Sequence, residues 1–106
     1  MDDLIVYRDG DGFRIVVNCA TREKDLQWMT QQTAGFDCTL MERSELSILA
    51  IQGPESLGRI QQILREHDKA AEADHVAELK PFIGGWCGDW FLARTGYTGE
   101  KGVEII

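Results

Sequence analysis

Short apolar runs joined by tight polar turns set the strongest limit on what this chain can fold into. The run Leu4–Tyr7 is followed by Asp9–Gly12, and a second apolar run covers Phe13–Asn18. Two such runs separated by Asp and Gly residues predict a β-hairpin, because glycine adopts the positive φ angles that tight turns need. Near the other end, Phe82–Trp86 and Trp90–Arg94 flank a second Gly-Asp turn. Hairpins place their strands antiparallel, so we expect an antiparallel sheet.

A first helix is predicted between the two hairpins. Thr21 can cap its N-terminus, and the acidic side chains that follow suit the first turn of a helix. We expect Leu26 and Met29 to form its buried side and the helix to end near Thr33–Gly35.

The middle of the chain predicts two strands and a second helix. Cys38–Arg43 alternates apolar and polar residues, and Leu46–Ile51 follows as a second β-rich run. Pro54 then favours a helix start. That helix has apolar residues at helical spacing, which we expect in the core: Leu57, Ile60, Ile63 and Leu64. The charged, alanine-rich stretch His67–Lys80 could hold a short helical turn, but its composition predicts the most exposed connection of the chain. Val103–Ile106 is expected to begin a further strand.

The order of these elements is ββαββα followed by further strands. It predicts an α+β fold, in which an antiparallel sheet carries helices packed on one face, ferredoxin-like in character. At 106 residues, we expect residues 1–106 to form a single domain.

Charge and cysteine content exclude several classes of function. A net charge of −7 without a basic patch argues against a nucleic-acid partner, and no apolar run is long enough to cross a membrane. Three cysteines without C-x-x-C spacing indicate reduced thiols in a cytosolic protein, and we expect Cys19, Cys38 and Cys87 to be buried. His67 and His75 have no nearby cysteine pair, so we expect surface histidines and no metal site.

The run Arg94–Glu104 carries the clearest chemical signal, with a glycine at every third residue from position 96 to 102. Its spacing fits neither the dinucleotide fingerprint nor the phosphate-binding loop. Tyr97 offers a ring for stacking, and the Glu104 carboxylate suits a ligand edge with two adjacent N–H donors. A glycine-rich hairpin turn with a surface glutamate is the alternative, and these residues alone leave both interpretations open.

Three further polar residues are candidates for a site. Asp2 and Asp3 are adjacent carboxylates, and side chains alternate along a strand, so at most one of them can join a given site. Both could instead form an acidic, solvated strand start. Asn18 follows the second strand, where its amide could bind a ligand or satisfy the turn backbone.

Taken together, these segments resemble the aminomethyltransferase (T-protein) family of the glycine cleavage system. The resemblance follows the family order over essentially the whole chain. It rests on Asp2–Tyr7, Val16–Asp25, Leu49–Pro54, Leu79–Phe82, and Thr95–Glu100 with Gly102 and Glu104.

The resemblance implies an enzyme that moves the one-carbon unit of a lipoyl-bound aminomethyl group to tetrahydrofolate with release of ammonia. A lipoylated carrier, the H-protein, would be its partner. Asp2 falls on the family's essential aspartate, near the reacting folate nitrogens. Asn18 and Tyr97 fall on folate-pocket positions, and Glu104 falls on the pterin-binding glutamate. The implied location is the cytoplasm, or the mitochondrial matrix in a eukaryote.

The resemblance also implies that this chain is incomplete, because members of the family have several hundred residues in three domains. We therefore expect an internal fragment of the folate-binding region that is inactive alone. Two alternatives stay open: a non-catalytic folate-binding or interaction module, and a folate-dependent demethylase of a methylated amine or sulfonium substrate. Unpaired strand edges at Leu4–Tyr7 and Val103–Ile106 would favour a homo-oligomer.

Overall fold

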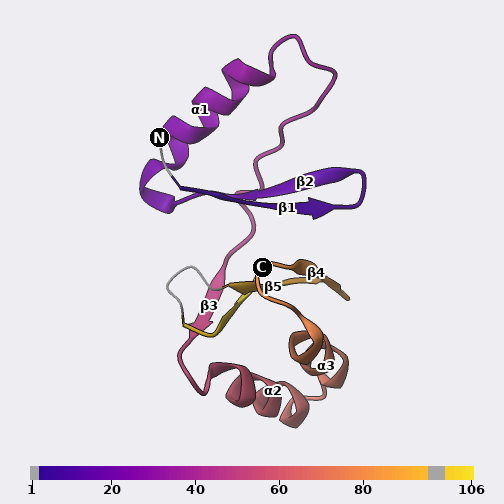
Figure 1. Cartoon of the computed structure of the whole chain (residues 1–106). Coiled ribbons are helices and arrows are strands. Elements are labelled where there is room, and N and C mark those ends of the chain that lie inside the picture. Colours follow the sequence, from indigo (N-terminus) through magenta and orange to yellow (C-terminus); the bar gives the residue numbers. More distant parts are fainter. Residues whose placement is uncertain (1–2, 96–99) are drawn as a thin grey trace. The chain divides into compact units, whose positions relative to one another are not determined.

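The computed structural model describes residues 3–95 and 100–106. Contacts divide the chain into two compact units, Met1–Glu45 and Leu46–Ile106, and Figure 1 labels most of their elements. The described residues form helices and two antiparallel sheets, which confirms the α+β fold class. That the two units make one domain stays a prediction.

A hairpin begins the first unit. β1 (Ile5–Asp9) pairs antiparallel with β2 (Gly12–Val16), which confirms the predicted hairpin. The turn between them places Gly10 at a φ of 59°, a conformation that costs glycine little because it has no Cβ. On the hairpin, the Arg8 guanidinium lies 5.6 Å from the centroid of the Phe13 ring.

The first predicted helix is confirmed at both ends. A short 3-10 helix, η1 (Cys19–Thr21), leads into α1 (Arg22–Thr33). The Thr21 hydroxyl donates a hydrogen bond of 2.8 Å to Asp25. No residue of α1 is fully buried. The side of the helix that was expected to be buried is therefore only half-buried.

The strand predicted over Cys38–Arg43 is wrong. Residues 34–48 contain neither helix nor strand. Alternating polarity is not sufficient for a strand, because its backbone groups need a neighbouring strand to bond. Among the described residues, the sheet of the first unit consists of β1 and β2 alone. Glu42 in this segment forms an ion pair with Arg22 at the start of α1.

The second unit is a four-stranded antiparallel sheet with two helices. Its elements are β3 (Leu49–Gln52), α2 (Ser56–Glu66), α3 (Ala70–Glu78), β4 (Gly84–Cys87), β5 (Trp90–Thr95) and β6 (Gly102–Ile105). The strand order is β3-β6-β5-β4, and β4 and β5 form the second predicted hairpin.

The last strand is not an edge. β6 pairs with β3 on one side and with β5 on the other, so the unpaired edge predicted at Val103–Ile106 is wrong. The edge strands of this sheet are β3 and β4. Self-association stays a prediction, and the edges that this sheet offers for it are these two strands.

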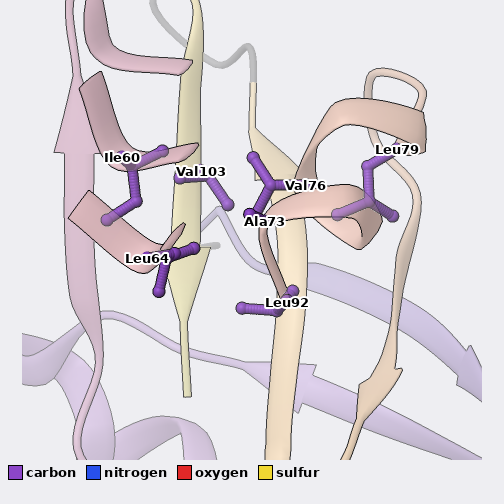
Figure 2. Close-up of a cluster of buried hydrophobic side chains, with 7 residues drawn as sticks. All are labelled: Ile60, Leu64, Ala73, Val76, Leu79, Leu92 and Val103. Carbon is purple, nitrogen blue, oxygen red and sulfur yellow. The ribbon is translucent and has the colours of Figure 1, made fainter. Parts of the chain in front are cut away.

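The core lies between the sheet and its two helices (Figure 2). The buried cluster consists of Ile60, Leu64, Ala73, Val76, Leu79, Leu92 and Val103. The stripe predicted for α2 is confirmed at Ile60 and Leu64, and Leu57 packs against the cluster. Ile63 is 50% exposed, so it lies outside the core.

The exposed connection predicted over His67–Lys80 is wrong, because most of it is α3. Ala73, Val76 and Leu79 recur every three residues and are all buried in the core. Because these small or medium-sized side chains are interspersed with charged residues in the sequence, the apolar face of the helix was not recognised. The carbonyl oxygen of Leu79 accepts a hydrogen bond of 2.9 Å from Arg94 Nη1, which ties the end of α3 to β5.

The cysteines are all free thiols, but two of the three burial predictions are wrong. Cys19 and Cys38 are exposed, while Cys87 is half-buried against the core cluster. A search of the described residues for a membrane-spanning helix finds none of sufficient length and apolarity.

Candidate functional site

The second unit presents one face of its sheet to the helices and the other face away from them. In β6, Val103 lies in the core cluster and Ile105 packs against it. Successive side chains of a strand point to opposite faces. Gly102 and Glu104 therefore lie on the face opposite the helices.

Strand register surrounds Glu104 with small residues. Ala50 of β3 and Ala93 of β5 are its direct cross-strand partners. Gly84 of β4 is in turn paired with Ala93. Directly paired residues of an antiparallel sheet share a face. Glu104 is consequently the one long side chain in a row of alanine and glycine, and this row forms a flat strip on either side of it.

The neighbouring rows on this face differ in polarity. On one side, Gly102 is paired with Gln52 and with Thr95. On the other side, Phe91 and Ile106 exchange two backbone hydrogen bonds of 3.0 Å. Phe91 is also paired with Trp86, and the two rings meet edge to face with centroids 5.6 Å apart. The Glu104 row thus lies between a polar row and an apolar one.

The Glu104 carboxyl has unused hydrogen-bonding capacity. Its side chain is half-buried, and Oε2 is buried without a hydrogen-bond partner among the described residues. Burial raises the pKa of Glu104 above its ordinary value, because the charged form of the carboxyl loses hydration. A buried, unpaired carboxyl oxygen costs stability, and such groups are concentrated at functional sites.

Gly102 is required by the close approach of β3. A Cβ at this position would lie 2.9 Å from the carbonyl oxygen of Ile51, which is backbone and cannot swing away. It would also lie 3.1 Å from Cγ of Gln52 and 3.3 Å from Oγ1 of Thr95. The side chains on both neighbouring strands therefore close over Gly102, and any larger residue would force β6 away from β3.

Asn18 belongs to the first unit, where its side chain has a structural contact. Its Nδ2 donates a hydrogen bond of 3.0 Å to the carbonyl oxygen of Asp3. Its own carbonyl accepts one of 3.2 Å from the Thr21 amide at the end of η1. Asn18 is exposed, and its side-chain oxygen has no described protein partner. The turn role is present in the structure, and a ligand role stays a prediction.

Two predicted site residues, Asp2 and Tyr97, lie outside the described residues. Asp3, the neighbour of Asp2, is exposed. Since Asn18 belongs to one compact unit and Glu104 to the other, the predicted site residues are not brought together within either unit. Within its own unit, Glu104 has Gln52 on the same face, a residue that the sequence argument did not nominate. The sequence does not show the strand register, and only the pairing of β3 with β6 reveals that these two side chains share a face.

Metal ligands do not gather anywhere in the described part of the chain, where no three His, Cys, Asp or Glu residues are close enough to hold an ion. His67 is exposed as expected. His75 is instead half-buried, with its ring against Gly85 and its Nε2 buried and unpaired among the described residues. It faces the helix-covered side of the sheet, away from Glu104.

A separate hollow of about 530 Å³ lies in the first unit. Its lining is mostly apolar and comes from β2, α1 and the segment after α1: Ile15, Trp28, Met29, Gln32, Thr33, Phe36, Asp37, Cys38 and Leu40. Neither Asn18 nor Glu104, the predicted site residues that the structure describes, lines it. The Glu104 face is therefore the better candidate for the site.

Comparison with known proteins identifies the family. The family described as "GCVT N-terminal domain" matches residues 1–106. This chain belongs to that family. The resemblance to aminomethyltransferases seen in the sequence is thereby confirmed.

Curated relatives of this GCVT N-terminal domain carry the name aminomethyltransferase. The protein of that name from Pseudomonas syringae pv. tomato is 53% identical over 106 residues, which is 100% of this chain and 28% of the relative. Those from Alcanivorax borkumensis and Chromobacterium violaceum are 50% and 49% identical, again over 100% of this chain and 28% of each relative. The chain thus spans little more than a quarter of the length of these relatives.

Proposed function

We propose that this chain supplies one wall of a tetrahydrofolate site in an aminomethyltransferase, with Glu104 as the residue that binds the pterin ring. The single observation that carries this proposal is the Glu104 carboxyl, which is half-buried and has an unpaired Oε2 among the described residues. A ligand with two adjacent N–H donors would complete its hydrogen bonds. The pterin ring of tetrahydrofolate has such an edge, formed by its amino group and a neighbouring ring N–H.

The surroundings of Glu104 also suit a flat ring. Ala50, Ala93 and Gly84 share its row and carry at most a methyl group. Ala93 is 0% exposed, whereas Ala50 is exposed. A planar heterocycle can therefore approach the carboxylate from the β3 side, where it meets only a methyl group. Trp86, which is 46% exposed and packs edge to face on the buried Phe91 ring, borders this row on one side and offers apolar contact to a ring or its substituents.

The other site residues complete the proposal. Asp2 would lie near the reacting folate nitrogens and help to position and polarise them. Tyr97 and Asn18 would line the same pocket. Support for these roles comes from family membership and from the match of each position to the family's motifs. The remaining wall would come from the part of the protein outside these 106 residues.

The proposed reaction starts from an aminomethyl group on the sulfur of a lipoyl arm, carried by an H-protein. Its methylene carbon forms bonds to two folate nitrogens, while its bonds to sulfur and to the amino nitrogen break. The two hydrogens lost by the folate nitrogens end on the thiol and on the ammonia that leaves. In this reaction the protein's residues bind and orient the folate, and they exclude water from the carbon being transferred.

The names of the relatives favour this reaction over the alternatives. Three relatives about 50% identical are aminomethyltransferases. A non-catalytic folate module or a demethylase would use the same pterin contact, so the Glu104 face does not discriminate among the three. The choice depends on which donor supplies the one-carbon unit.

The test is a donor comparison with the protein in its full native length. Aminomethyl-loaded H-protein and tetrahydrofolate should release ammonia, and omission of tetrahydrofolate should slow that release strongly. The 106-residue chain should give no turnover, since it holds one wall of the site. Ammonia release that does not depend on tetrahydrofolate would refute the proposed function. Turnover with free dimethylglycine, sarcosine or a methylated sulfonium compound, but not with H-protein, would identify a demethylase instead.

A further inference from the structure

Gln52 is the polar side chain placed beside Glu104 by strand register. Gln52 is paired with Gly102, and Glu104 lies two residues further along β6 on the same face. Such diagonal neighbours have Cα atoms about 7–8 Å apart, which is within joint reach of one ring-shaped ligand. Because Gly102 has no side chain, Cγ of Gln52 leans over β6 to within 3.1 Å of where a Cβ would be.

The Gln52 amide is also available for a ligand. The residue is exposed on edge strand β3, and its side chain makes no hydrogen bond within the described part of the chain. An amide carries two N–H donors, so it can donate to an acceptor atom of a ligand. Glu104, when ionised, can only accept. Together, the two side chains therefore suit a ligand edge on which hydrogen-bond donors lie next to a hydrogen-bond acceptor.

We infer that Gln52 is a ligand-contacting residue that selects pterins bearing a ring carbonyl next to the donor edge bound by Glu104. This inference rests on the proposed function. Along one edge, a pterin carries an amino group, a ring N–H and then a carbonyl oxygen. Glu104 accepts from the first two groups, and a Gln52 N–H donates to the carbonyl that follows.

Ala50 keeps the path between these two side chains open. It is exposed and lies on β3 directly opposite Glu104, two residues before Gln52 on the same face. A long side chain here would cover the strip from which the ring edge reaches both polar groups. Its exposed place on an edge strand means that a larger apolar residue can be accommodated there without disturbing the core.

The test measures the affinity of the full-length protein for two ligands, 5-formyltetrahydrofolate and its 2,4-diamino analogue. The analogue has an amino group in place of the carbonyl and no hydrogen on the adjacent ring nitrogen, so the effect of Gln52 is read from the change in preference between wild type and variant. The wild-type protein should prefer the carbonyl form. Gln52→Ala should weaken binding of that form by about tenfold, the usual effect of one lost hydrogen bond, and change the diamino form less. Ala50→Leu should weaken both ligands by more than about tenfold. Gln62→Ala, on α2 at the opposite face of the sheet, is the matched control and should change neither.

The outcomes separate this inference from the proposed function. If Glu104→Gln weakens pterin binding but Gln52→Ala leaves the preference between the two ligands unchanged, Gln52 does not select the carbonyl and only this inference is overturned. If the wild-type protein binds neither pterin, both the proposed function and this inference fail. Melting temperatures measured on every variant distinguish lost contacts from lost folding, because a structural role for Gln52 would weaken both ligands equally.

Discussion

Ala50 of β3 lies directly opposite Glu104 of β6, so only a methyl group borders the carboxylate on that side. On the other side, Ala93 of β5 is its partner. A charged residue in the interior of a sheet is ordinarily paired with a polar or oppositely charged neighbour. Here both neighbours are alanines, and Oε2 is left without a described partner. The arrangement costs stability and leaves the carboxylate free to bind a ligand, as expected of a functional site.

Replacing Glu104 should therefore stabilise the fold at neutral pH. Burial raises the pKa of Glu104 above its ordinary value, so the folded state holds its proton over a pH range in which the unfolded state has lost it. The free energy of unfolding consequently falls as the pH rises through that window, and the loss is complete above the raised pKa. Glu104→Gln removes this pH-dependent loss of stability. Urea unfolding from pH 4 to pH 8 should show a more stable variant at the neutral end and little difference at the acidic end.

A control is needed because the substitution also changes the net charge. Glu78→Gln removes one exposed carboxyl from α3 and serves this purpose. If Glu104→Gln and Glu78→Gln gave the same unfolding curves at every pH, the unpaired carboxyl would not be a source of strain.

Local sequence signals were sufficient to predict both hairpins, the first helix and the strand at Val103–Ile106. The hairpins depend on turn residues that act over a few positions, and the first helix has the predicted acidic side chains in its first turn. The strand at Cys38–Arg43 and the exposed stretch at His67–Lys80 were predicted wrongly, because pairing and packing decide their structures. Alternating polarity does not provide a pairing partner, and alanine and valine amid charges do not reveal a helix that completes a core.

Part of the candidate site could likewise be predicted from the sequence, and part of it could not. Glu104 could be nominated from its place after a glycine-rich run, since the chemistry of a carboxylate is evident from residue type. The sequence could not identify the residues beside it, because they come from other strands: Ala50, Ala93 and Gln52. Only the register of β3, β5 and β6 brings them to one face.

Gly102→Ala should destabilise the second unit by about 1–3 kcal/mol, the usual cost of forcing a group into a filled space. The new Cβ would meet the Ile51 carbonyl oxygen at 2.9 Å, and neither backbone can yield without stretching the pairing of β3 and β6. Chemical denaturation measures the effect. Gly58→Ala is the matched control, since nothing lies within 4 Å of a Cβ on this helical residue. It should stabilise by roughly 0.4–1 kcal/mol, and an equal effect of the two substitutions would contradict this account of Gly102.

Leu92→Ala should destabilise the second unit by about 2–5 kcal/mol, because it leaves a cavity that a rigid sheet cannot fill. Leu92 is 0% exposed and lies in the cluster between β5 and the helices. Leu49→Ala is the control on the same sheet, since Leu49 is 61% exposed and should change stability by about 0.5 kcal/mol or less. Equal losses in thermal or urea unfolding would mean that the core has been misassigned.

The central claim is that Glu104 binds the donor edge of a pterin, and the most direct test is the affinity of the full-length protein for tetrahydrofolate. Calorimetry under anaerobic conditions should compare the wild-type protein with Glu104→Gln, and with Glu78→Gln as the control. Hydrogen bonds to a charged group contribute roughly 1.5–3 kcal/mol, so Glu104→Gln should weaken binding by about 10- to 150-fold. Glu78→Gln should bind as the wild type does. Equal affinity of all three proteins for tetrahydrofolate would contradict the claim.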